Sequence, residues 1–204
     1  MKLSVFILLP FFICCNQAEK EKRIAIQPYT GFKITDAKIV SKIIEDIFDV
    51  KTVILPEKEL YKGAFIQTKS PRYRADSIIR FQRKELMSYD YVIGLTSSDI
   101  STTKRDQNGH VKEPNQKYLD WGIMGLAFCP GNSCIVSDFR LKDKRGAVAI
   151  DRLKKVAAHE FGHNLGLPHC PDKRCFMTDA VESIGTIDHA RLSLCEACKK
   201  RLAV

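Results

Sequence analysis

Two histidines and a glutamate form a short motif, in which His159 and His163 are four residues apart and Glu160 follows the first histidine. Positions i and i+4 lie one above the other on a helix, so both imidazoles can reach one metal ion, with the carboxylate beside it. Gly166 permits a backbone conformation that ends the helix and brings His169 toward the same ion. Three nitrogen ligands leave the fourth position of a tetrahedral zinc ion open for water, which is typical of catalytic rather than structural zinc sites.

The chemistry that this arrangement predicts is hydrolysis of a peptide bond. A zinc ion lowers the pKa of its bound water toward about 7 and polarises a carbonyl group. Glu160 lies where it can take the proton from that water and pass it to the leaving nitrogen. The alternative is a non-hydrolytic, zinc-containing peptide-binding protein of the cell envelope, but such a protein has no need of a carboxylate beside the open metal position. A protein that only handles metal ions conflicts with the predicted helix and glycine turn.

Four cysteines follow the histidines in two pairs. Cys170 and Cys175 are separated by four residues, and the second pair, Cys195 and Cys198, by two. Two pairs at this separation suit a tetrahedral zinc site, and the two-residue spacing is typical of a metal knuckle. Two disulfide bonds are the competing interpretation and would be natural in an exported protein. With the histidine site, the favoured interpretation gives two zinc ions per chain, one catalytic and one structural.

Residues 158–198 resemble the archaemetzincins, a family of zinc metallopeptidases of the metzincin type. The shared pattern is HExxHxxGxxHC, four residues, C, one residue, M, seventeen residues and CxxC, and every fixed position is filled in this sequence. The resemblance implies a metzincin-like α+β fold and a packing role for Met177 beneath the catalytic metal. It also implies His159, His163 and His169 as ligands of a catalytic zinc, Glu160 as the catalytic base, and Cys170, Cys175, Cys195 and Cys198 as ligands of a structural zinc.

The elements that must position these residues follow from the hydrophobic pattern. Before residue 96 the pattern has the order β-α-β-α-β, with Thr35 as the cap of the first helix. This order predicts an α/β fold built on a mixed, mostly parallel twisted sheet with crossover helices. The predicted strands cover residues 23–29, 51–55, 63–67 and 89–95, and the predicted helices cover residues 36–48 and 74–86.

Residues 96–120 are polar and predict a long surface loop. After it, residues 122–128 and 134–140 predict two strands that form a hairpin-like excursion at one edge of the sheet. We expect the first of these strands to pair with an extended peptide, with Gly125 allowing close backbone approach. Cys129 and Cys134 lie outside the family pattern, and we expect a disulfide between them rather than free thiols.

The active-site helix is predicted over residues 147–165, and Gly166 ends it. Residues 167–204 are too few to bury much core, so they predict a small cysteine-rich subdomain that zinc holds together. His110 and His189 have no ligand spacing around them, and we interpret both as loop or surface residues.

The N-terminal residues have the layout of a signal peptide. Lys2 precedes an apolar run, residues 3–13, that is too short to span a bilayer. The run ends in Cys14 and Cys15, as in a bacterial lipoprotein signal. A small residue is expected before the cleaved bond, so we expect cleavage before Cys15 and lipidation of its thiol.

The sequence therefore predicts a signal peptide over residues 1–15, with Cys15 becoming the mature N-terminus, and a polar tether over residues 16–22. A catalytic domain follows over residues 23–204, divided into an upper subdomain (23–166) and a C-terminal subdomain (167–204). We expect the chain in the bacterial cell envelope, periplasmic or at the cell surface and anchored by lipid, or in the cytoplasm if the signal is not processed.

Composition and charge limit the partners. An apolar fraction of 45% with 28% charged residues is ordinary for a soluble globular domain. The formal charge of +9 favours anionic surfaces or acidic polypeptides, but the basic residues are spread along the chain with no nucleic-acid motif beside them. We expect a peptide or protein substrate, a membrane contact through the lipid on Cys15, no nucleic acid, and a monomer.

Overall fold

The computed structural model describes residues 22–179 and 183–202. The predicted signal peptide, Cys15 and most of the predicted tether lie outside the described residues. Within the described part of the chain, no helix is both long and apolar enough to cross a bilayer.

The main sheet is mixed and mostly parallel, as the sequence predicts. It has five strands in the order β2-β1-β5-β9-β8, and only the outermost pair, β8 with β9, is antiparallel. Crossover helices return the chain to the same end of the sheet from β1 to β2 and from β2 to β5, whereas the connection from β5 to β9 runs through a second sheet and β8. The strands are β1 (Arg23–Pro28), β2 (Lys51–Ile54), β5 (Tyr91–Thr96), β8 (Gly125–Ala127) and β9 (Ser133–Ser137).

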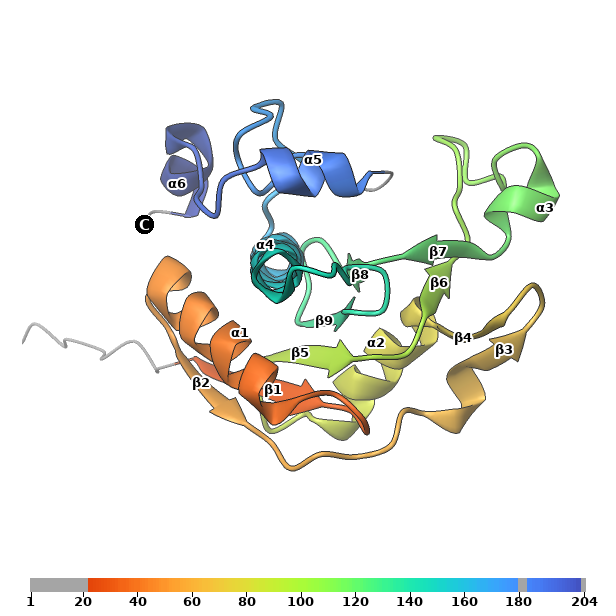
Figure 1. The fold of residues 1–204 in the computed structure, drawn as a ribbon, viewed down its shortest axis with the longest axis horizontal. Helices are drawn as coiled ribbons and strands as arrows, with labels where there is room; N and C mark the ends of the chain where they lie inside the picture. Colours follow the sequence, from red (N-terminus) through yellow and green to blue (C-terminus); the bar gives the residue numbers. More distant parts are fainter. Residues whose placement is uncertain (1–21, 180–182, 203–204) are drawn as a thin grey trace, which may run out of the picture.

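Helices cover both faces of this sheet (Figure 1). Helices α1 (Ile34–Phe48) and α4 (Gly146–Asn164) pack on one face, where Ile93 and Phe161 are among the fully buried core residues. Helix α2 (Ala75–Glu85) covers the other face. On each face the apolar side of a helix packs on the sheet and forms a hydrophobic core. Helix α4, which carries the histidines, is held in place by this packing.

A second, smaller sheet extends from the first. Its order is β3-β4-β6-β7, and part of it lies inside residues 96–120, which were wrongly expected to be one long loop. The sequence predicted strands that overlap two of its members, at residues 63–67 and 122–128, but not the sheet itself. The predicted strand 122–128 is divided between the two sheets, because the chain bends at Met124. Strands this short carry too few residues to show a period, yet Ile100 is fully buried between α2 and the sheet. The elements are a 3-10 turn (Lys62–Ala64), β3 (Phe65–Gln67), β4 (Pro71–Arg74), β6 (Ile100–Thr102), α3 (Asn115–Tyr118) and β7 (Trp121–Ile123).

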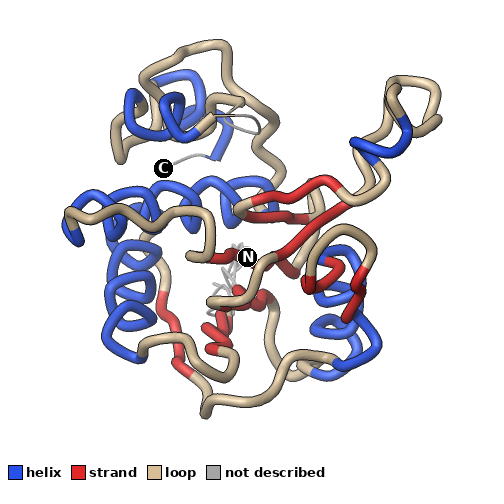
Figure 2. Tube along the Cα trace, turned by 45° about the vertical axis from the view of Figure 1, so that its right-hand side comes forward, coloured by secondary structure: helices blue, strands red, loops and turns tan. Residues whose placement is uncertain are grey.

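The C-terminal subdomain lies across α4 from the main sheet, so that α4 runs between the two (Figures 1 and 2). It contains α5 (Ile184–His189) and α6 (Glu196–Leu202). Arg152 of α4 donates two hydrogen bonds of 2.7 Å to the carboxylate of Asp188, which holds α5 against the active-site helix.

Two further expectations are wrong. Helix α1 begins at Ile34 with Lys33 at its cap, so Thr35 lies in the first turn and donates to Asp36 instead of capping the helix. Cys129 and Cys134 are free thiols, because Cys134 is buried on β9 whereas Cys129 is exposed and points its sulfur to a backbone carbonyl.

Candidate metal centre

Helix α4 presents His159, Glu160 and His163 from its last two turns. The helix ends just beyond them, where Gly166 adopts a left-handed φ of 92° that a side chain would strain. This turn sends the chain back toward the helix and carries His169 to the two helical histidines. The three rings have centroid separations of 4.5, 4.9 and 5.4 Å, and one nitrogen from each lies within 4.8 Å of the others.

Backbone carbonyls orient the two helical imidazoles. His159 Nδ1 lies 2.8 Å from the carbonyl oxygen of Phe176, and His163 Nδ1 lies 2.7 Å from that of Leu167. Each carbonyl fixes the tautomer in which Nδ1 carries the proton, so Nε2 is left with a lone pair for a metal. Burial lowers the pKa of His159 to about 3 and also lowers that of His163, so both are neutral as metal ligands must be.

Glu160 is buried between its own helix α4 and the edge strand β8, with only 8% of its surface exposed. Burial raises its pKa to about 8, since water that would solvate the charge is excluded. Gly125 makes this position possible, because a Cβ there would lie 2.5 Å from Glu160 Oε1. A metal cation at the histidines would favour the ionised carboxylate and oppose the effect of burial.

Met177 lies directly against the helix between the two histidines. It is fully buried, and a Cβ at Gly162 would lie 2.5 Å from its sulfur. The backbone N–H of Cys170 donates to the carbonyl of Met177 at 2.8 Å, which ties the turn carrying His169 to the segment beneath the rings. Met177 therefore packs under the histidine cluster and offers no ligand of its own.

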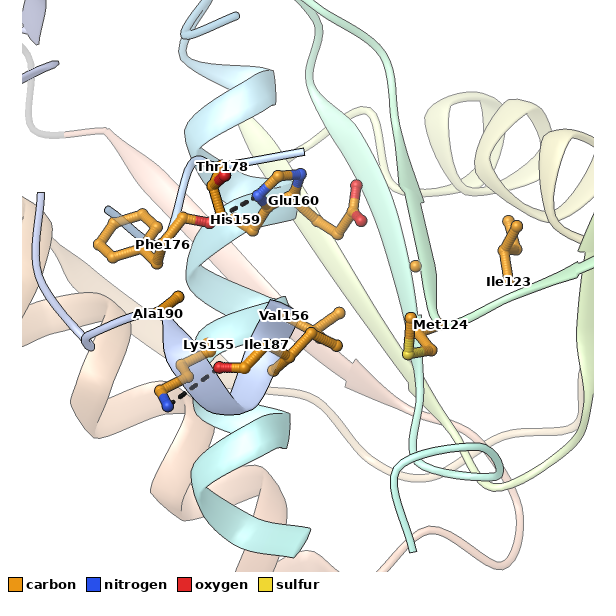
Figure 3. Close-up of a pocket in the computed structure, with 11 residues that line it drawn as sticks. Ile123, Met124, Lys155, Val156, His159, Glu160, Phe176, Thr178, Ile187 and Ala190 are labelled. Carbon is orange, nitrogen blue, oxygen red and sulfur yellow. Dashed lines mark hydrogen bonds between the residues drawn. The ribbon is translucent and has the colours of Figure 1, made fainter. Parts of the chain in front are cut away.

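A small, mainly apolar pocket of about 60 Å³ opens beside Glu160 (Figure 3). Met124 lines it from the strand edge, Val156 from α4 and Ile187 from α5. Lys155 also borders it, but its amine turns away to the carbonyl of Ile187 at 3.1 Å, which leaves the interior without a charge from that side chain.

One edge of the two sheets is open along this pocket. Strands β7 and β8 follow each other along the chain and are each the outermost strand of a sheet. Ser137, at the end of β9, donates from Oγ to the carbonyl of Ser98, just before β6. This bond joins β9, the partner of β8, to the start of β6, the partner of β7, so both partner strands lie on the same side of residues 121–127. The opposite edge of residues 121–127 pairs with no strand among the described residues.

Four cysteines form a second cluster in the C-terminal subdomain. One sulfur atom from each lies within 4.8 Å of the others, and all four are free thiols. The sulfurs of Cys170 and Cys195 are 3.6 Å apart, much longer than the S–S bond of about 2.05 Å in a disulfide. Burial raises the pKa of the Cys175 and Cys198 thiols, so a cation is needed for these sulfurs to ionise together.

The remaining histidines are apart from both clusters, as expected. His110 is exposed and lies near Asp106, and His189 is exposed at the end of α5. The sequence reasoning overlooked Asp179, whose carboxylate lies 3.8 Å from His169 Nδ1, and Asn164, which bonds to the β8–β9 hairpin. It also overlooked the carbonyls of Leu167 and Phe176, for which no side-chain signal exists.

The site combines three clustered histidines with a buried carboxylate, and the carboxylate shares its helix with two of the histidines. In an α/β fold of this kind, such a site defines a metal-dependent hydrolase. Residues 87–204 match the sequence model of peptidase family M54. Archaemetzincin of Halobacterium salinarum is 26% identical over 187 residues, which cover 87% of this chain and 98% of that protein. Archaemetzincin of Methanopyrus kandleri is 31% identical over 131 residues, which cover 64% of this chain and 66% of that protein.

Solved structures share the fold. The crystal structure of archaemetzincin from Methanopyrus kandleri has a TM-score of 0.73 at 24% identity and covers 90% of this chain and 94% of that one. Archaemetzincin from Archaeoglobus fulgidus, solved in complex with malonate, has a TM-score of 0.70 at 24% identity and covers 88% and 99%. The chain belongs to peptidase family M54, the family of the archaemetzincins, and is a zinc metallopeptidase.

Proposed function

We propose that His159, His163 and His169 hold the catalytic zinc through one nitrogen each. The observation that carries this proposal is the pair of carbonyl contacts that leaves Nε2 of both helical histidines free beside His169. Neutral imidazoles at this separation match the donor set of a catalytic zinc site with an open position. Asp179 near His169 supplies the outer contact that such ligands commonly have.

Glu160 acts in this proposal as the general base and then the general acid. When bound, zinc supplies a Lewis acid that activates water and polarises the substrate carbonyl. The Glu160 carboxylate accepts a proton from the water and returns it to the leaving nitrogen. Its burial against Gly125 limits its contact with bulk water and holds the carboxylate in one place.

The peptide substrate pairs, in this proposal, with the open edge of residues 121–127. Backbone groups along an outermost strand can bond an extended peptide by strand addition. The pocket beside Glu160 is then filled by the side chain of a residue next to the cleaved bond, and its apolar lining favours an apolar side chain.

The deciding experiment compares Glu160→Gln with His163→Ala on zinc-loaded protein. Glu160→Gln should retain zinc at the histidines and lose peptide turnover by roughly 10²- to 10⁴-fold, because the base is removed and the ligands remain. His163→Ala should lose that zinc together with activity. Zinc content by mass spectrometry and turnover of a peptide library measure both. A Glu160→Gln variant as fast as the parent would show that the proposed role of Glu160 is wrong.

The four cysteines bind, in the same proposal, a second and structural zinc. Their sulfurs form a closed cluster, which suits a tetrahedral site with no position for substrate. The purified chain should therefore carry two zinc ions. The histidine zinc should leave first when a chelator is added.

We also propose lipid anchoring at Cys15 in the bacterial cell envelope. The support is the apolar run over residues 3–13 followed by the cysteine pair. Residues 16–22 would then form a tether that spans at most roughly 25 Å when extended, which would hold the domain near the membrane. Detergent phase partitioning and intact-mass measurement of the full chain and of Cys15→Ser test this, and a full-length chain with an intact N-terminus would contradict it.

A further inference from the structure

A network of charged side chains lies beside β7, outside the histidine site. Arg140 donates from Nε and Nη2 to the two carboxylate oxygens of Asp99, both at 2.8 Å. Arg72 pairs with the same carboxylate at 3.2 Å and with Asp120 at 3.5 Å. The side chains of Arg72, Asp99 and Asp120 are at most 10% exposed, whereas that of Arg140 is 36% exposed. Arg140 is therefore the member of this group that presents positive charge to solvent.

The guanidinium of Arg140 lies on the backbone of β7 at Gly122. A Cβ at Gly122 would lie 2.1 Å from Nη2 and 2.3 Å from Cζ of Arg140, so only glycine leaves room for it. The next residue, Ile123, packs with Ile100 on the face that α2 covers. Because successive side chains of a strand alternate, Gly122 and the guanidinium over it face the side of α4. Arg140 thus shares this face of the open edge with the pocket beside Glu160.

A peptide paired with the open edge would bring its own side chains to the same face. Directly opposed residues of neighbouring strands place their side chains on one face of the sheet, about 5 Å apart. A peptide residue opposite Gly122 would therefore place its side chain, or its terminal carboxylate, beside the guanidinium of Arg140. Gly125, which contacts Glu160, is three residues further along the chain, or roughly 10 Å for extended backbone. Because the chain bends at Met124 between β7 and β8, the strict alternation is interrupted, and both glycines can face the side of α4.

We propose that Arg140 is a specificity-determining residue that binds a carboxylate of the substrate two or three residues after the cleaved bond. Asp99 holds the guanidinium in place by its two hydrogen bonds, and Nη1 makes no hydrogen bond within the described residues, so one donor group stays available. A guanidinium held in this way matches a carboxylate in geometry and charge. The direction assumes antiparallel pairing, which is the more stable pairing per residue. The substrate class is a peptide with an acidic side chain there, or one that ends there. This inference rests on the proposed function of the open edge.

The test uses the zinc-loaded full chain and a series of matched peptides. The peptides carry Asp or Asn at the second or third position after the cleaved bond, or end there as a free acid or an amide. A further pair carries Asp or Asn before the cleaved bond. We expect the parent protein to favour the carboxylate after the bond by about tenfold or more in kcat/KM, the scale of a hydrogen bond to a charged group. Comparing the Asp peptides with the free-acid peptides shows whether the preferred carboxylate is a side chain or the end of the peptide.

Three variants separate Arg140 from general electrostatics. Arg140→Gln should bring the carboxylate preference close to unity. Gly122→Ala should weaken it as well, because the new Cβ displaces the guanidinium without removing its charge from the chain. Lys142→Gln removes one positive charge from an exposed side chain two residues further along, and should keep the preference.

Binding of the same peptides to zinc-loaded Glu160→Gln protein gives a readout that does not depend on turnover. Fluorescence anisotropy should give a lower Kd for the carboxylate peptides, and adding Arg140→Gln should remove the difference. A parent that cleaves neutral and acidic peptides equally and binds them equally would overturn the Arg140 assignment and leave the peptidase mechanism standing. A preference that survives Arg140→Gln would overturn it too. A zinc-loaded parent protein that cleaves none of the peptides, although Glu160→Gln still binds the carboxylate peptides more tightly, would count against the proposed mechanism alone.

Discussion

The two clusters of candidate ligands are built in opposite ways. The histidine cluster joins one long helix to the returning chain, and it faces a pocket and an open strand edge. The cysteine cluster lies within the C-terminal subdomain, where Cys170, Cys175 and Cys198 are buried and the fourth, Cys195, is partly buried. The two clusters therefore differ in what keeps them rigid. The main sheet and its helices support the histidine cluster, whereas the cysteine cluster has to stabilise the short C-terminal subdomain in which it lies.

The two clusters are nevertheless coupled through a few residues. Cys175 is followed at once by Phe176, whose carbonyl orients His159, and by Met177, which packs under the helix. Cys170 follows His169 directly and bonds to the Met177 carbonyl. We therefore expect the histidine site to depend on the intact cysteine site. We expect the cysteine site to depend only weakly on the histidine site.

The largest effect should come from Cys198→Ala, which removes one ligand from the closed cluster. We expect the zinc content to fall from two ions to one and the free energy of unfolding to fall by about 3 kcal/mol or more, because metal binding is part of the folding free energy of such a segment. Activity should fall with it, since the Phe176 carbonyl loses its support. Zinc analysis, thermal unfolding and hydrogen exchange of residues 183–202 measure these effects.

Cys129→Ala is the matched control for the cysteine cluster, because this thiol is exposed and outside the cluster. It should leave the cysteine-bound zinc and the unfolding unchanged; its sulfur donates to the Leu167 carbonyl that contacts His163, so the comparison is confined to the cysteine site. Four cysteines found oxidised in the parent protein, with a zinc count of one, would contradict the structural zinc and leave the histidine site intact.

The second-largest effect should come from Gly125→Ala, beside the open histidine site. The added Cβ would lie 2.5 Å from Glu160 Oε1 and 2.8 Å from its Cδ, so the carboxylate must move. We expect kcat to fall by roughly 10²-fold, the scale of a misplacement of about 1 Å, and stability to fall by about 1–3 kcal/mol. Zinc at the histidines should remain, because the glycine touches none of the ligands.

The control for this variant is Gly146→Ala at the start of α4, where an added Cβ meets nothing within 4 Å. It should change neither turnover nor zinc content. Loss of zinc in Gly125→Ala would show that the edge strand supports the ligands as well as the carboxylate.

The sequence predicted the candidate ligands that the structure brings together, but only part of what positions them. His159, His163 and Gly166 are close in sequence, and helix periodicity with a glycine break is enough to bring them together. The carbonyls of Phe176 and Leu167 cannot be predicted in this way, because every residue has one and only the returning chain selects them. Gly125 was expected to allow close approach of a substrate, and in the structure the group that approaches it is Glu160.

The fold divides in the same way. The long helices show their period over about three turns or more, and β1 and β5 are mostly apolar runs of six residues, so the order of these elements was predictable from the sequence. The second sheet was not, because its strands have three or four residues and depend on contacts such as those of Ile100. That sheet continues the open edge past the pocket, so the part of the proposed substrate site furthest from the histidine motif was also the least predictable.

The smallest and sharpest test compares two buried amides that hold the β8–β9 hairpin from opposite faces. Asn164, which follows His163, donates from Nδ2 to the carbonyls of Phe128 and Ser133 at 2.9 and 3.0 Å. Gln82 of α2 donates from Nε2 to the carbonyl of Cys134 at 3.1 Å. Both side chains are at most 2% exposed.

Asn164→Leu and Gln82→Met should each lower the free energy of unfolding by about 1–3 kcal/mol, because each removes the buried amide that donates to the hairpin carbonyls. Only Asn164→Leu should also change catalysis, since its bonds join the end of the active-site helix to the strand edge where the peptide is proposed to pair. We expect a several-fold rise in KM with zinc retained, measured by steady-state kinetics beside thermal unfolding. Equal kinetics in the two variants at equal loss of stability would show that the open site depends on the sheet as a whole, and that Asn164 has no special part in placing the edge against His163.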